Sequence, residues 1–570
     1  MPRTGIAASA GKRPACGSDS ILFPWEVAGV LMWQRFSFGE KIVLLLGLFF
    51  WLAFSIYAAP VFGGTDTFLF RDAACNLLHG QGFSTASFEH SHSFRPLLYA
   101  SYTPLTQWTF LIFAALWHCR PATATLYNFV IAIAIDLAVL GLIVRRMQPG
   151  LMRTVAIVLI AVTLPVGYMG IQAERPEYIT FLLLLLLLIA LRSPLPLGRL
   201  VGCSIIASLA FLAEPIGGVF GSALIGGAIV LGRNGLQRKS VGGVVSRLAI
   251  SAIAFLIPIG IVVGVYQHKD HASVARFIHQ AKVGGLSRKE TDDGRIHSAD
   301  LNNGSVAPTD ETHRLGAADK YVDALRFIKA LGPLQEGVEL SAMIVVLIWL
   351  VLLVRSKGNR WSIAALAFAG LVLFVAVFGV FPLQPNYLVL TRSLFPFVLL
   401  FDWAGCRGAL RTEKVIEIVT VLNLIVLLPG LLLVSLMRLE GRESYLVAQK
   451  QVALLKSYLT SHTAQNNVVL APSTHYYLYK EAFPNLYNPS YLSSQHDMSQ
   501  VVAIANCDTA SPFFIPGTKP LPEGVNPTKF KLFDSGSPSV SVTLLHRKLM
   551  SKNWTWSCDL YVSKSLEKPQ

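Results

Sequence analysis

Charged side chains are scarce in this 570-residue chain, where Asp, Glu, Lys and Arg make up 14% of the residues, against about 25% in soluble domains. The deficit is concentrated in long apolar runs, and runs of about 20 apolar residues cross a bilayer as helices. These runs are continuous rather than alternating, which excludes the strands of a membrane barrel. We therefore expect a polytopic helical membrane protein. The clearest runs are residues 41–59, 179–191, 248–266, 342–354 and 415–437.

Several motifs of soluble enzymes are also missing. The chain has no phosphate-binding loop, no dinucleotide fingerprint, no Gly-x-Ser-x-Gly and no His-Glu-x-x-His, so nucleotide-dependent, serine-hydrolase and zincin chemistry are not indicated. The seven cysteines lack the spacing of a metal site. Cys507 and Cys558 both lie near the C-terminus, where they form either a disulfide or two unpaired thiols.

The formal charge of +15 first suggests nucleic acid, but the distribution of the basic residues indicates a membrane instead. They gather in short loops between apolar runs, as in residues 145–153, 233–247 and 404–414, which is typical of loops on the cytoplasmic side. Residues 1–40 are expected to form a cytoplasmic tail for the same reason. The first run begins too deep in the chain for a signal peptide and is expected to stay as a helix. We expect no nucleic-acid partner.

Placing the basic loops on one side of the bilayer divides the chain into three parts. After the tail, residues 41–437 are expected to form an all-α polytopic bundle of about 11–13 transmembrane helices, with outer loops at 61–102 and 267–337. Residues 438–570 are expected to form a small soluble α/β domain outside the cytoplasm, with a helix at 443–460. Its strands are expected at 468–471, 501–504 and 540–545.

The helix count is inconsistent at one place. With 61–100 outside and the basic loop 145–153 inside, the segments 103–118 and 123–144 cannot both span the bilayer. Residues 103–118 are short and form a partial or re-entrant helix, or else the basic loop departs from the charge rule. Residues 200–231 are expected to form a tight hairpin with Glu214-Pro215 at its outer tip.

The most informative polar stretch, residues 61–107, directly follows the first apolar run. Gly63-Gly64 allow a sharp bend, and Asp66 then precedes a helical pattern. At a membrane–water boundary on the face opposite the basic tail, this carboxylate suits a general base or a metal-organising group. Alternatively, it caps the helix that begins at Thr67. Asp72 lies farther along that helix and is expected to pair with an arginine, Arg71 or Arg95.

A second charged group separates two apolar runs at the same predicted face. Glu174, Arg175 and Glu177 are close together in the sequence, and charges at membrane depth are costly unless they are paired or used. The alternative is a solvated salt bridge in an ordinary loop. We favour a functional group because the charges are compact and flanked by apolar residues, and because arginine offers a planar fork for phosphate.

Two further arginines are candidates for binding phosphate. Arg95 lies in the first loop and Arg392 near the outer end of a late helix, and charge-assisted hydrogen bonds to phosphate are strong. Arginines at a boundary more commonly reach lipid headgroups. His90 and His92 supply only two potential metal ligands, so we assign no metal site.

The layout of these residues resembles the membrane-embedded GT-C glycosyltransferases of the dolichyl-phosphate-mannose mannosyltransferase and aminoarabinose transferase type. The resemblance covers about residues 40–440 and extends to the soluble tail. The sequence departs from the family pattern at two places. Thr67 follows Asp66 where the family often has a second acidic residue. Tyr102-Thr103 precede the single proline Pro104 where the family often has a lysine before two prolines. The matching residues are Asp66, Ala73-Ala74, Asn76-Leu77-Leu78, Gly80-Gln81-Gly82, Thr103-Pro104-Leu105 and Glu177.

The resemblance implies that a sugar passes with inversion from a polyprenyl-phosphate donor to a glycan, lipid or protein acceptor outside the cytoplasm, at a bacterial inner membrane. It implies no certain cofactor and leaves a divalent metal open, because family members differ. The implied catalytic residues are Asp66, as the base, and Glu177. The implied substrate- and phosphate-binding residues are Arg95, Arg175, Arg392, Glu174, Asp72 and Tyr102.

Two other functions are compatible with the sequence. A membrane transporter or flippase would typically have internal repeats and helices broken at mid-membrane, whereas no clear repeat is evident and the polar residues gather at one face. An oligosaccharide polymerase or ligase of the O-antigen type would use a large outer loop, and residues 267–337 suit that alternative.

Overall fold

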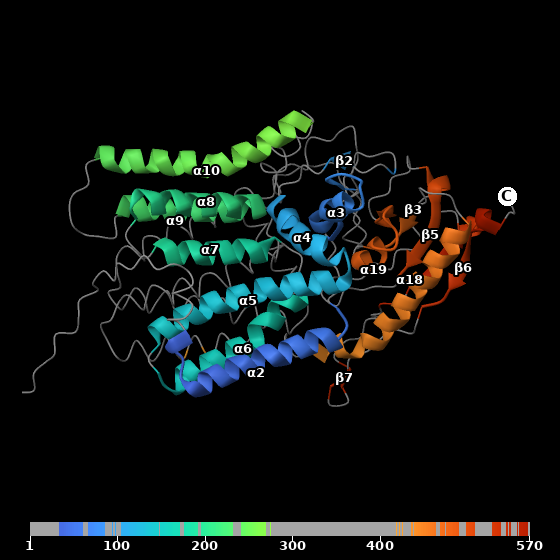
Figure 1. The fold of residues 1–570 in the computed structure, drawn as a ribbon, viewed down its shortest axis with the longest axis horizontal. Coiled ribbons are helices and arrows are strands. Elements are labelled where there is room, and N and C mark those ends of the chain that lie inside the picture. The colour runs from blue at the N-terminus through green and yellow to red at the C-terminus, as the bar shows by residue number, and fades with distance from the viewer. Residues whose placement is uncertain are drawn as a thin grey trace, which may run out of the picture.

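The computed structural model is a bundle of helices that carries a small sheet region at one end (Figure 1). The predicted outer loop 267–337 and the runs 342–354 and 415–437 lie almost wholly outside the described residues, so the expected number of transmembrane helices stays a prediction. The structure describes mainly residues 33–60, 67–85, 104–147, 149–171, 176–191, 195–231 and 241–269 and, with short gaps, 438–507 and 527–567.

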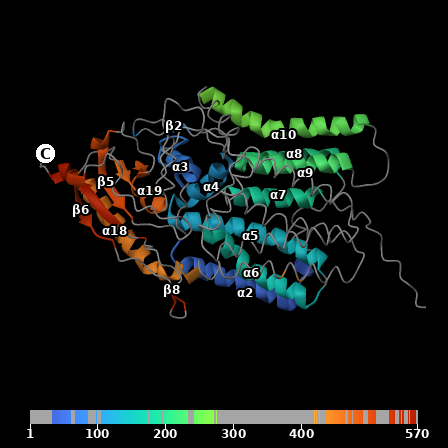
Figure 2. The same ribbon diagram turned by 180° about the vertical axis from the view of Figure 1, so that it is seen from behind.

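Apolar helices run side by side through the bundle, as the two opposite views show (Figure 1, Figure 2). Among the described residues, three segments are long and apolar enough to cross a bilayer: Phe38–Tyr57, Pro121–Gly141 and Val241–Lys269. The chain is thus a mostly helical membrane protein. The bundle helices are α2 (Phe38–Tyr57), α5 (Pro121–Arg146), α6 (Leu151–Ile171), α7 (Glu177–Leu191), α8 (Leu197–Ala213), α9 (Pro215–Leu231) and α10 (Val241–Lys269).

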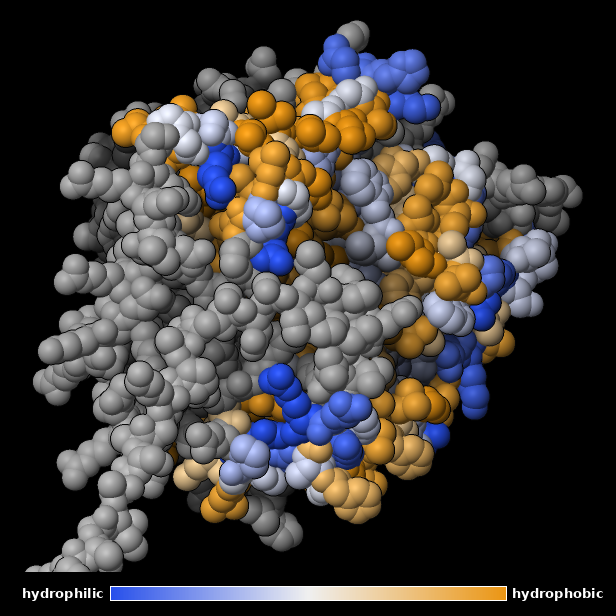
Figure 3. All heavy atoms as spheres, turned by 60° about the vertical axis from the view of Figure 1, so that its left-hand side comes forward, coloured by the Kyte–Doolittle hydropathy of each residue, from blue (hydrophilic) through white to orange (hydrophobic). Residues whose placement is uncertain are grey.

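The bundle has an apolar interior and an apolar exterior. Side chains such as Ile135, Ile157 and Leu185 are completely buried between α5, α6 and α7. On the outside, Phe49 of α2 is 71% exposed and Ile261 of α10 is 63% exposed. Hydrophobic side chains also cover much of the described surface in Figure 3. Apolar residues on both sides of a helix are expected where it faces protein on one side and lipid on the other.

Helix α2 begins at a strong local N-terminal capping motif. Ser37 and Glu40 form a reciprocal capping box, which satisfies backbone donors at the start of α2. Glu40 also forms a buried ion pair with Arg153 of α6, with 2.9 Å between Glu40 Oε2 and Arg153 Nη2. One arginine of the predicted basic loop is therefore used to pair two helices at this end of the bundle.

Two short helices, α3 (Thr67–Leu78) and α4 (Pro104–Trp117), lie over the opposite end of the bundle. Leu105 of α4 packs on the cluster of Leu212 and Tyr266, in the last turns of α8 and α10. Farther along α4, Phe110 packs edge-on against Tyr127, in the second turn of α5. We call this end of the bundle, with α3 and α4 over it, the capped end.

The course of α4 bears on the helix count. Because α4 runs across the ends of α5, α8 and α10, it does not extend through the bundle beside them. This favours the alternative in which 103–118 does not span the bilayer, and the basic loop 145–153 can then keep to the charge rule. The next helices α5 to α10 alternate in direction, so that α6, α8 and α10 all end on the capped side.

The predicted hairpin over 200–231 is confirmed as α8 and α9, which are separated by Glu214 alone. Its tightness depends on two glycines at the start of α9. A side chain at Gly217 would overlap Thr180 of α7, and one at Gly218 would overlap Phe211 of α8, where even the backbone Cα would be only 2.7 Å away.

The C-terminal region is a mixed five-stranded sheet in the order β4-β3-β5-β9-β6. Strand β3 pairs in parallel with β4 and β5, whereas β9 is antiparallel to β5 and β6. Helix α18 (Arg442–His462) places Ala448, Val452, Leu455 and Leu459 in the core, one apolar stripe at helical spacing. The strands are β3 (Val468–Leu470), β4 (Leu486–Tyr487), β5 (Val501–Asn506), β6 (Phe530–Asp534) and β9 (Asp559–Ser563), and short 3-10 turns cover Met498–Gln500, Pro527–Lys529 and Lys564–Glu567.

The predicted helix at 443–460 and the strands near 468–471 and 501–504 are confirmed by α18, β3 and β5. Of the strand predicted at 540–545 the structure describes β7 (Thr543–Leu544), which pairs with β8 (Arg547–Lys548) in a separate hairpin. The sheet region shares one hydrophobic cluster with the capped end, since Leu455 and Tyr477 belong to the same cluster as Phe110 and Ala213.

We expect Gly218→Ala to lower the free energy of unfolding by about 1–3 kcal/mol, because the added methyl overpacks the α8–α9 contact. Gly226→Ala is the matched control in the same helix, since a Cβ there meets nothing within 4 Å, and it should leave stability unchanged or slightly higher. Unfolding in mixed detergent–SDS micelles measures both variants. Equal stability of the two variants would contradict the packing described for the hairpin.

Candidate functional site

The capped end is where the structure gathers polar and ionisable side chains from distant parts of the chain. Helix α3 begins at Thr67, directly after Asp66 in the sequence, and ends before a turn in which Gly80 and Gly82 have φ angles of +77° and +74°. Positive φ of this kind is readily adopted only by glycine. The turn leads into β1 (Ser84–Thr85), which pairs with β2 (Leu97–Leu98).

A disulfide between Cys75 and Cys119 joins α3 to the turn between α4 and α5. The turn itself is unusual, because His118 has a φ of +63°, a conformation that non-glycine residues rarely adopt. Beside it, Arg120 lies 3.6 Å from the carboxylate of Glu481, and the Cys119 amide donates to the same carboxylate at 3.3 Å. This corner therefore connects α3, α4 and α5 to the sheet region.

A buried ion pair at the capped end joins α3 to α19 (Tyr476–Lys480). Lys480 Nζ lies 2.9 Å from Asp72 Oδ1, and the two side chains are 1% and 0% exposed. Tyr476 donates its hydroxyl to Asp72 Oδ1 at 2.9 Å, and Asn76 Nδ2 donates to Asp72 Oδ2 at 3.1 Å. The Asp72 carboxylate is thus held by three groups, two of them from the sheet region.

The Lys480 ammonium has further hydrogen-bond acceptors besides the Asp72 carboxylate. It also donates to Asn76 Oδ1 and, at 2.8 Å, to the carbonyl of Pro484. Burial lowers the pKa of Lys480, while the adjacent Asp72 opposes that shift. Burial and the positive charge of Lys480 also lower the pKa of His79, at the end of α3. The carboxylates of Glu481 and Asp72 oppose that shift of the His79 pKa.

Arg71 lies next to this network, on a different side of α3. Its guanidinium is 4.9 Å from the Phe110 ring and 4.8 Å from the Tyr127 ring, and Nη1 donates to the carbonyl of Thr106 at 3.2 Å. A desolvated arginine over aromatic faces contributes cation–π stabilisation. Arg71 thereby attaches α3 to α4 and α5, as Asp72 attaches it to the sheet region.

The structure describes two of the predicted site residues. Asp72 is buried and paired with Lys480, a partner that the sequence did not indicate. Glu177 is the first residue of α7, and Ile179, two residues later, shares a hydrophobic cluster with Ala74 and Cys75 of α3. The start of α7 is therefore brought to the same end of the bundle as α3. Asp66, Arg95, Tyr102, Glu174, Arg175 and Arg392 lie outside the described residues.

Several ionisable residues of this end were missed by the sequence reasoning. Lys480 follows an aromatic stretch that resembles a core segment, and Arg438 follows the last apolar run like an ordinary boundary arginine. Glu214, recognised only as the tip of a hairpin, is 3% exposed at the junction of α8 and α9. A charged residue directly beside an apolar or aromatic run was the one available signal, because burial of such charges is rare unless they are paired.

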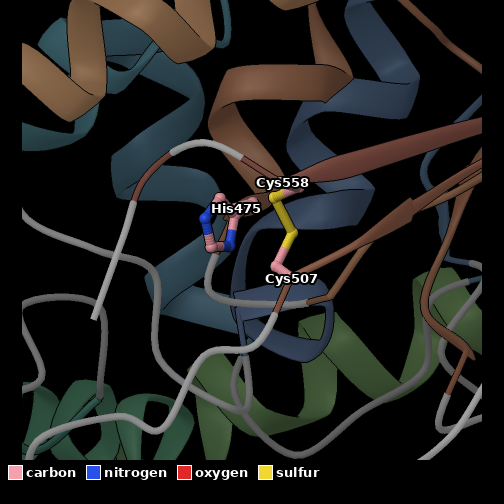
Figure 4. A group of neighbouring side chains, drawn as sticks. All are labelled: His475, Cys507 and Cys558. Atoms are coloured by element: carbon pink, nitrogen blue, oxygen red, sulfur yellow. A yellow bond between two sulfur atoms is a disulfide. The ribbon is translucent and has the colours of Figure 1, made fainter. Parts of the chain in front are cut away.

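Three potential metal ligands lie together in the sheet region. Ligand atoms of His475, Cys507 and Cys558 are all within 4.8 Å of one another. Figure 4 shows the His475 ring beside the sulfur–sulfur bond that joins the two cysteines. Both sulfurs are used in that disulfide, so no thiolate is left to bind a metal. Of the two alternatives for Cys507 and Cys558, the structure has the disulfide.

No protein-family model matches this chain, and no curated protein matches it in sequence. Among solved structures, the crystal structure of the Archaeoglobus fulgidus oligosaccharyltransferase in complex with Zn and sulfate is similar over 81% of this chain and 67% of that chain. The two chains are 11% identical over this match, and the TM-score is 0.38. A likeness of this extent does not by itself assign a function.

We expect Lys480→Met and Asp72→Asn each to lower the free energy of unfolding by about 3–5 kcal/mol, because each leaves a buried polar group without its partner. The double variant should cost less than the sum of the two, since the residues interact directly. Unfolding in mixed micelles measures all three variants.

Arg120→Gln provides the control for this cycle, because it removes an ion pair with Glu481 in which the arginine is 58% exposed. Such exposed pairs contribute about 0–1 kcal/mol. Additive effects of Lys480→Met and Asp72→Asn, or losses no larger than that of Arg120→Gln, would show that the buried pair does not hold α3 to the sheet region.

Proposed function

We propose that this protein is a GT-C-type membrane glycosyltransferase that moves a sugar from a polyprenyl-phosphate donor to an acceptor outside the cytoplasm. The observation that carries the proposal is the meeting of α3 and the start of α7 in one cluster at the capped end. Asp66 directly precedes the first of these helices, and Glu177 opens the second. Two acidic candidates far apart in sequence thus begin elements that pack together at one end of an apolar bundle.

The proposed reaction is a single displacement with inversion at the anomeric carbon. Asp66 accepts the proton of the acceptor hydroxyl, whose oxygen forms the new glycosidic bond as the bond to the lipid phosphate breaks. Glu177 would assist at the acceptor. The leaving phosphate would be stabilised by nearby cations and donors, for which the candidates are Arg95, Arg175, Arg392 and Tyr102, with Glu174 beside them.

Asp72 has a different part in this proposal from the one its sequence position suggested. Its carboxylate is fully buried and engaged by Lys480, Tyr476 and Asn76, so it suits holding α3 in place better than touching the substrate. Asp66 would then owe its position to a network that lies one to two turns farther along the same helix. A base must be held within hydrogen-bond reach of the proton that it removes.

We propose that the capped end faces an oxidising compartment, outside the inner membrane of a bacterium. It contains the Cys75–Cys119 disulfide, and the sheet region that shares its core contains Cys507–Cys558. Disulfides persist outside the cytoplasm and are rare within it. The basic loop 145–153 follows α5 at the opposite end of the bundle, which agrees with the positive-inside rule.

The transporter alternative is less well supported. Glu214-Pro215, the tip of the α8–α9 hairpin, lies at the capped end, where Ala213 belongs to the same cluster as α3. It is therefore not an interruption in the middle of a spanning helix, the feature that marks substrate sites in many transporters.

We expect Asp66→Asn to lower the rate of sugar transfer by about 10²–10⁴-fold, because the amide cannot accept the acceptor proton. The measurement is release of polyprenyl phosphate from a panel of radiolabelled polyprenyl-phosphate sugars by membranes that contain the protein. Asp497→Asn, at a fully exposed carboxylate of the sheet region, is the control. Normal transfer by an Asp66→Asn variant present at the wild-type level would refute the proposed mechanism.

The proposed orientation is tested through the cysteines. Replacing Cys16, Cys203 and Cys406 by Ser leaves four of the seven cysteines, all in the two disulfides. We expect the denatured protein to react with no maleimide before reduction and with four equivalents after it, as counted by intact mass. Full reaction before reduction would mean that the capped end is not in an oxidising compartment.

A further inference from the structure

A second buried arginine at the capped end, Arg438, has two terminal amino groups for which the described residues offer no acceptor. Arg438 is 4% exposed and lies where the last predicted transmembrane run joins the sheet region. Its Nε donates to the carbonyl of Ala59 at 2.8 Å, and the Ala59 amide donates to the Arg438 carbonyl at 2.9 Å. Its guanidinium carbon lies 5.0 Å from the Phe54 ring. These contacts fix the plane of the guanidinium at the end of α2.

Within the described part of the chain, the outer edge of this guanidinium meets no hydrogen-bond acceptor. Both terminal amino groups, Nη1 and Nη2, are shielded from solvent, and no hydrogen-bond acceptor in the described part of the chain reaches them. Burial lowers the pKa of Arg438 to about 10, so the group still carries its charge at neutral pH. Buried charged donors without acceptors are costly, which points to an anion that completes the site.

We propose that Arg438 binds the phosphate group of a polyprenyl lipid at the end of α2. The two terminal amino groups form a planar fork that matches two oxygens of one phosphate. The Ala59 carbonyl occupies the inner donor and thereby orients the fork. The proposal deepens the proposed function, on which it rests, by assigning a phosphate contact that the sequence motifs did not indicate.

The surroundings of Arg438 favour a lipid over a soluble phosphate. The last residues of α2 next to it, Ile56 and Tyr57, are 79% and 57% exposed, and the outward face of α2 is apolar along its length. A polyprenyl chain could lie on that face while its phosphate reaches the guanidinium. Ala59, which accepts from Arg438, also lies shortly before Asp66 in the sequence. The Arg438 site therefore adjoins the segment that carries the proposed base.

The test uses the full-length protein in nanodiscs, with polyprenyl phosphate as the probe. We expect binding, measured as a dissociation constant and as a rise in melting temperature, to weaken at least tenfold in Arg438→Gln. Arg438→Lys should recover only part of the binding, because it keeps the charge but not the planar fork. Arg442→Gln is the matched control. It removes the same charge one helical turn away, from a guanidinium that lies 3.8 Å over the Tyr57 ring, and should bind like the wild type.

Two further binding measurements identify which part of the lipid the protein recognises. Polyprenol, which lacks the phosphate, should not bind, and competition by inorganic phosphate would show how much of the affinity belongs to the phosphate alone. Polyprenyl phosphate that fails to stabilise the wild-type protein would overturn the proposal even if Arg438→Gln does not fold. Equal binding by Arg438→Gln and the wild type would overturn it as well.

The outcomes also separate this inference from the proposed function. Loss of transfer in Asp66→Asn with undiminished lipid binding in Arg438→Gln would keep the glycosyltransferase and reject the Arg438 site. Loss of binding in Arg438→Gln with normal transfer in Asp66→Asn would keep the phosphate site and reject the catalytic base.

Discussion

The pairing of Asp72 with Lys480 is the contact on which the capped end depends. Both side chains are almost completely buried, and charges in such surroundings are tolerated only when their partners are in place. Tyr476 and Asn76 complete the set of partners. The first loop helix and the C-terminal sheet region are therefore specified together, because neither could bury its charge without the other.

The remaining contacts of α3 support the same arrangement from other directions. Arg71 lies against two aromatic rings of α4 and α5, and Cys75 is covalently bound to Cys119. A short helix has little stability of its own. Fixed on three sides, α3 is held in one position, as the proposed role of Asp66 as a base requires.

The membrane explains why the polar groups gather where they do. Charges are costly within the apolar layer, so the described bundle keeps its polar side chains mainly at its two ends. At one end Glu40 and Arg153 pair α2 with α6. At the other, Asp72, Lys480, Arg71 and Arg438 all lie beneath the sheet region or beside it. The lipid-soluble donor and the water-soluble acceptor of the proposed reaction would meet at this kind of boundary.

The sequence determined the class of protein and the type of most elements. Long apolar runs predicted the helices, because hydrocarbon excludes unpaired backbone groups. A helical pattern followed by short strand patterns predicted α18, β3 and β5, and Glu214-Pro215 correctly indicated a hairpin tip. These features depend on local composition and spacing, which are visible in one segment at a time.

Tertiary structure alone decided the partners. Nothing near Asp72 in the sequence indicates Lys480, nothing near Cys75 indicates Cys119, and nothing near Ala59 indicates Arg438. For α4 the sequence left two alternatives open, and only its packing across the ends of its neighbours favours the one in which it does not span the bilayer. Such pairings arise because folding brings distant segments into one dry environment, where each polar group must find an acceptor or donor, and a single sequence carries no record of which one it finds.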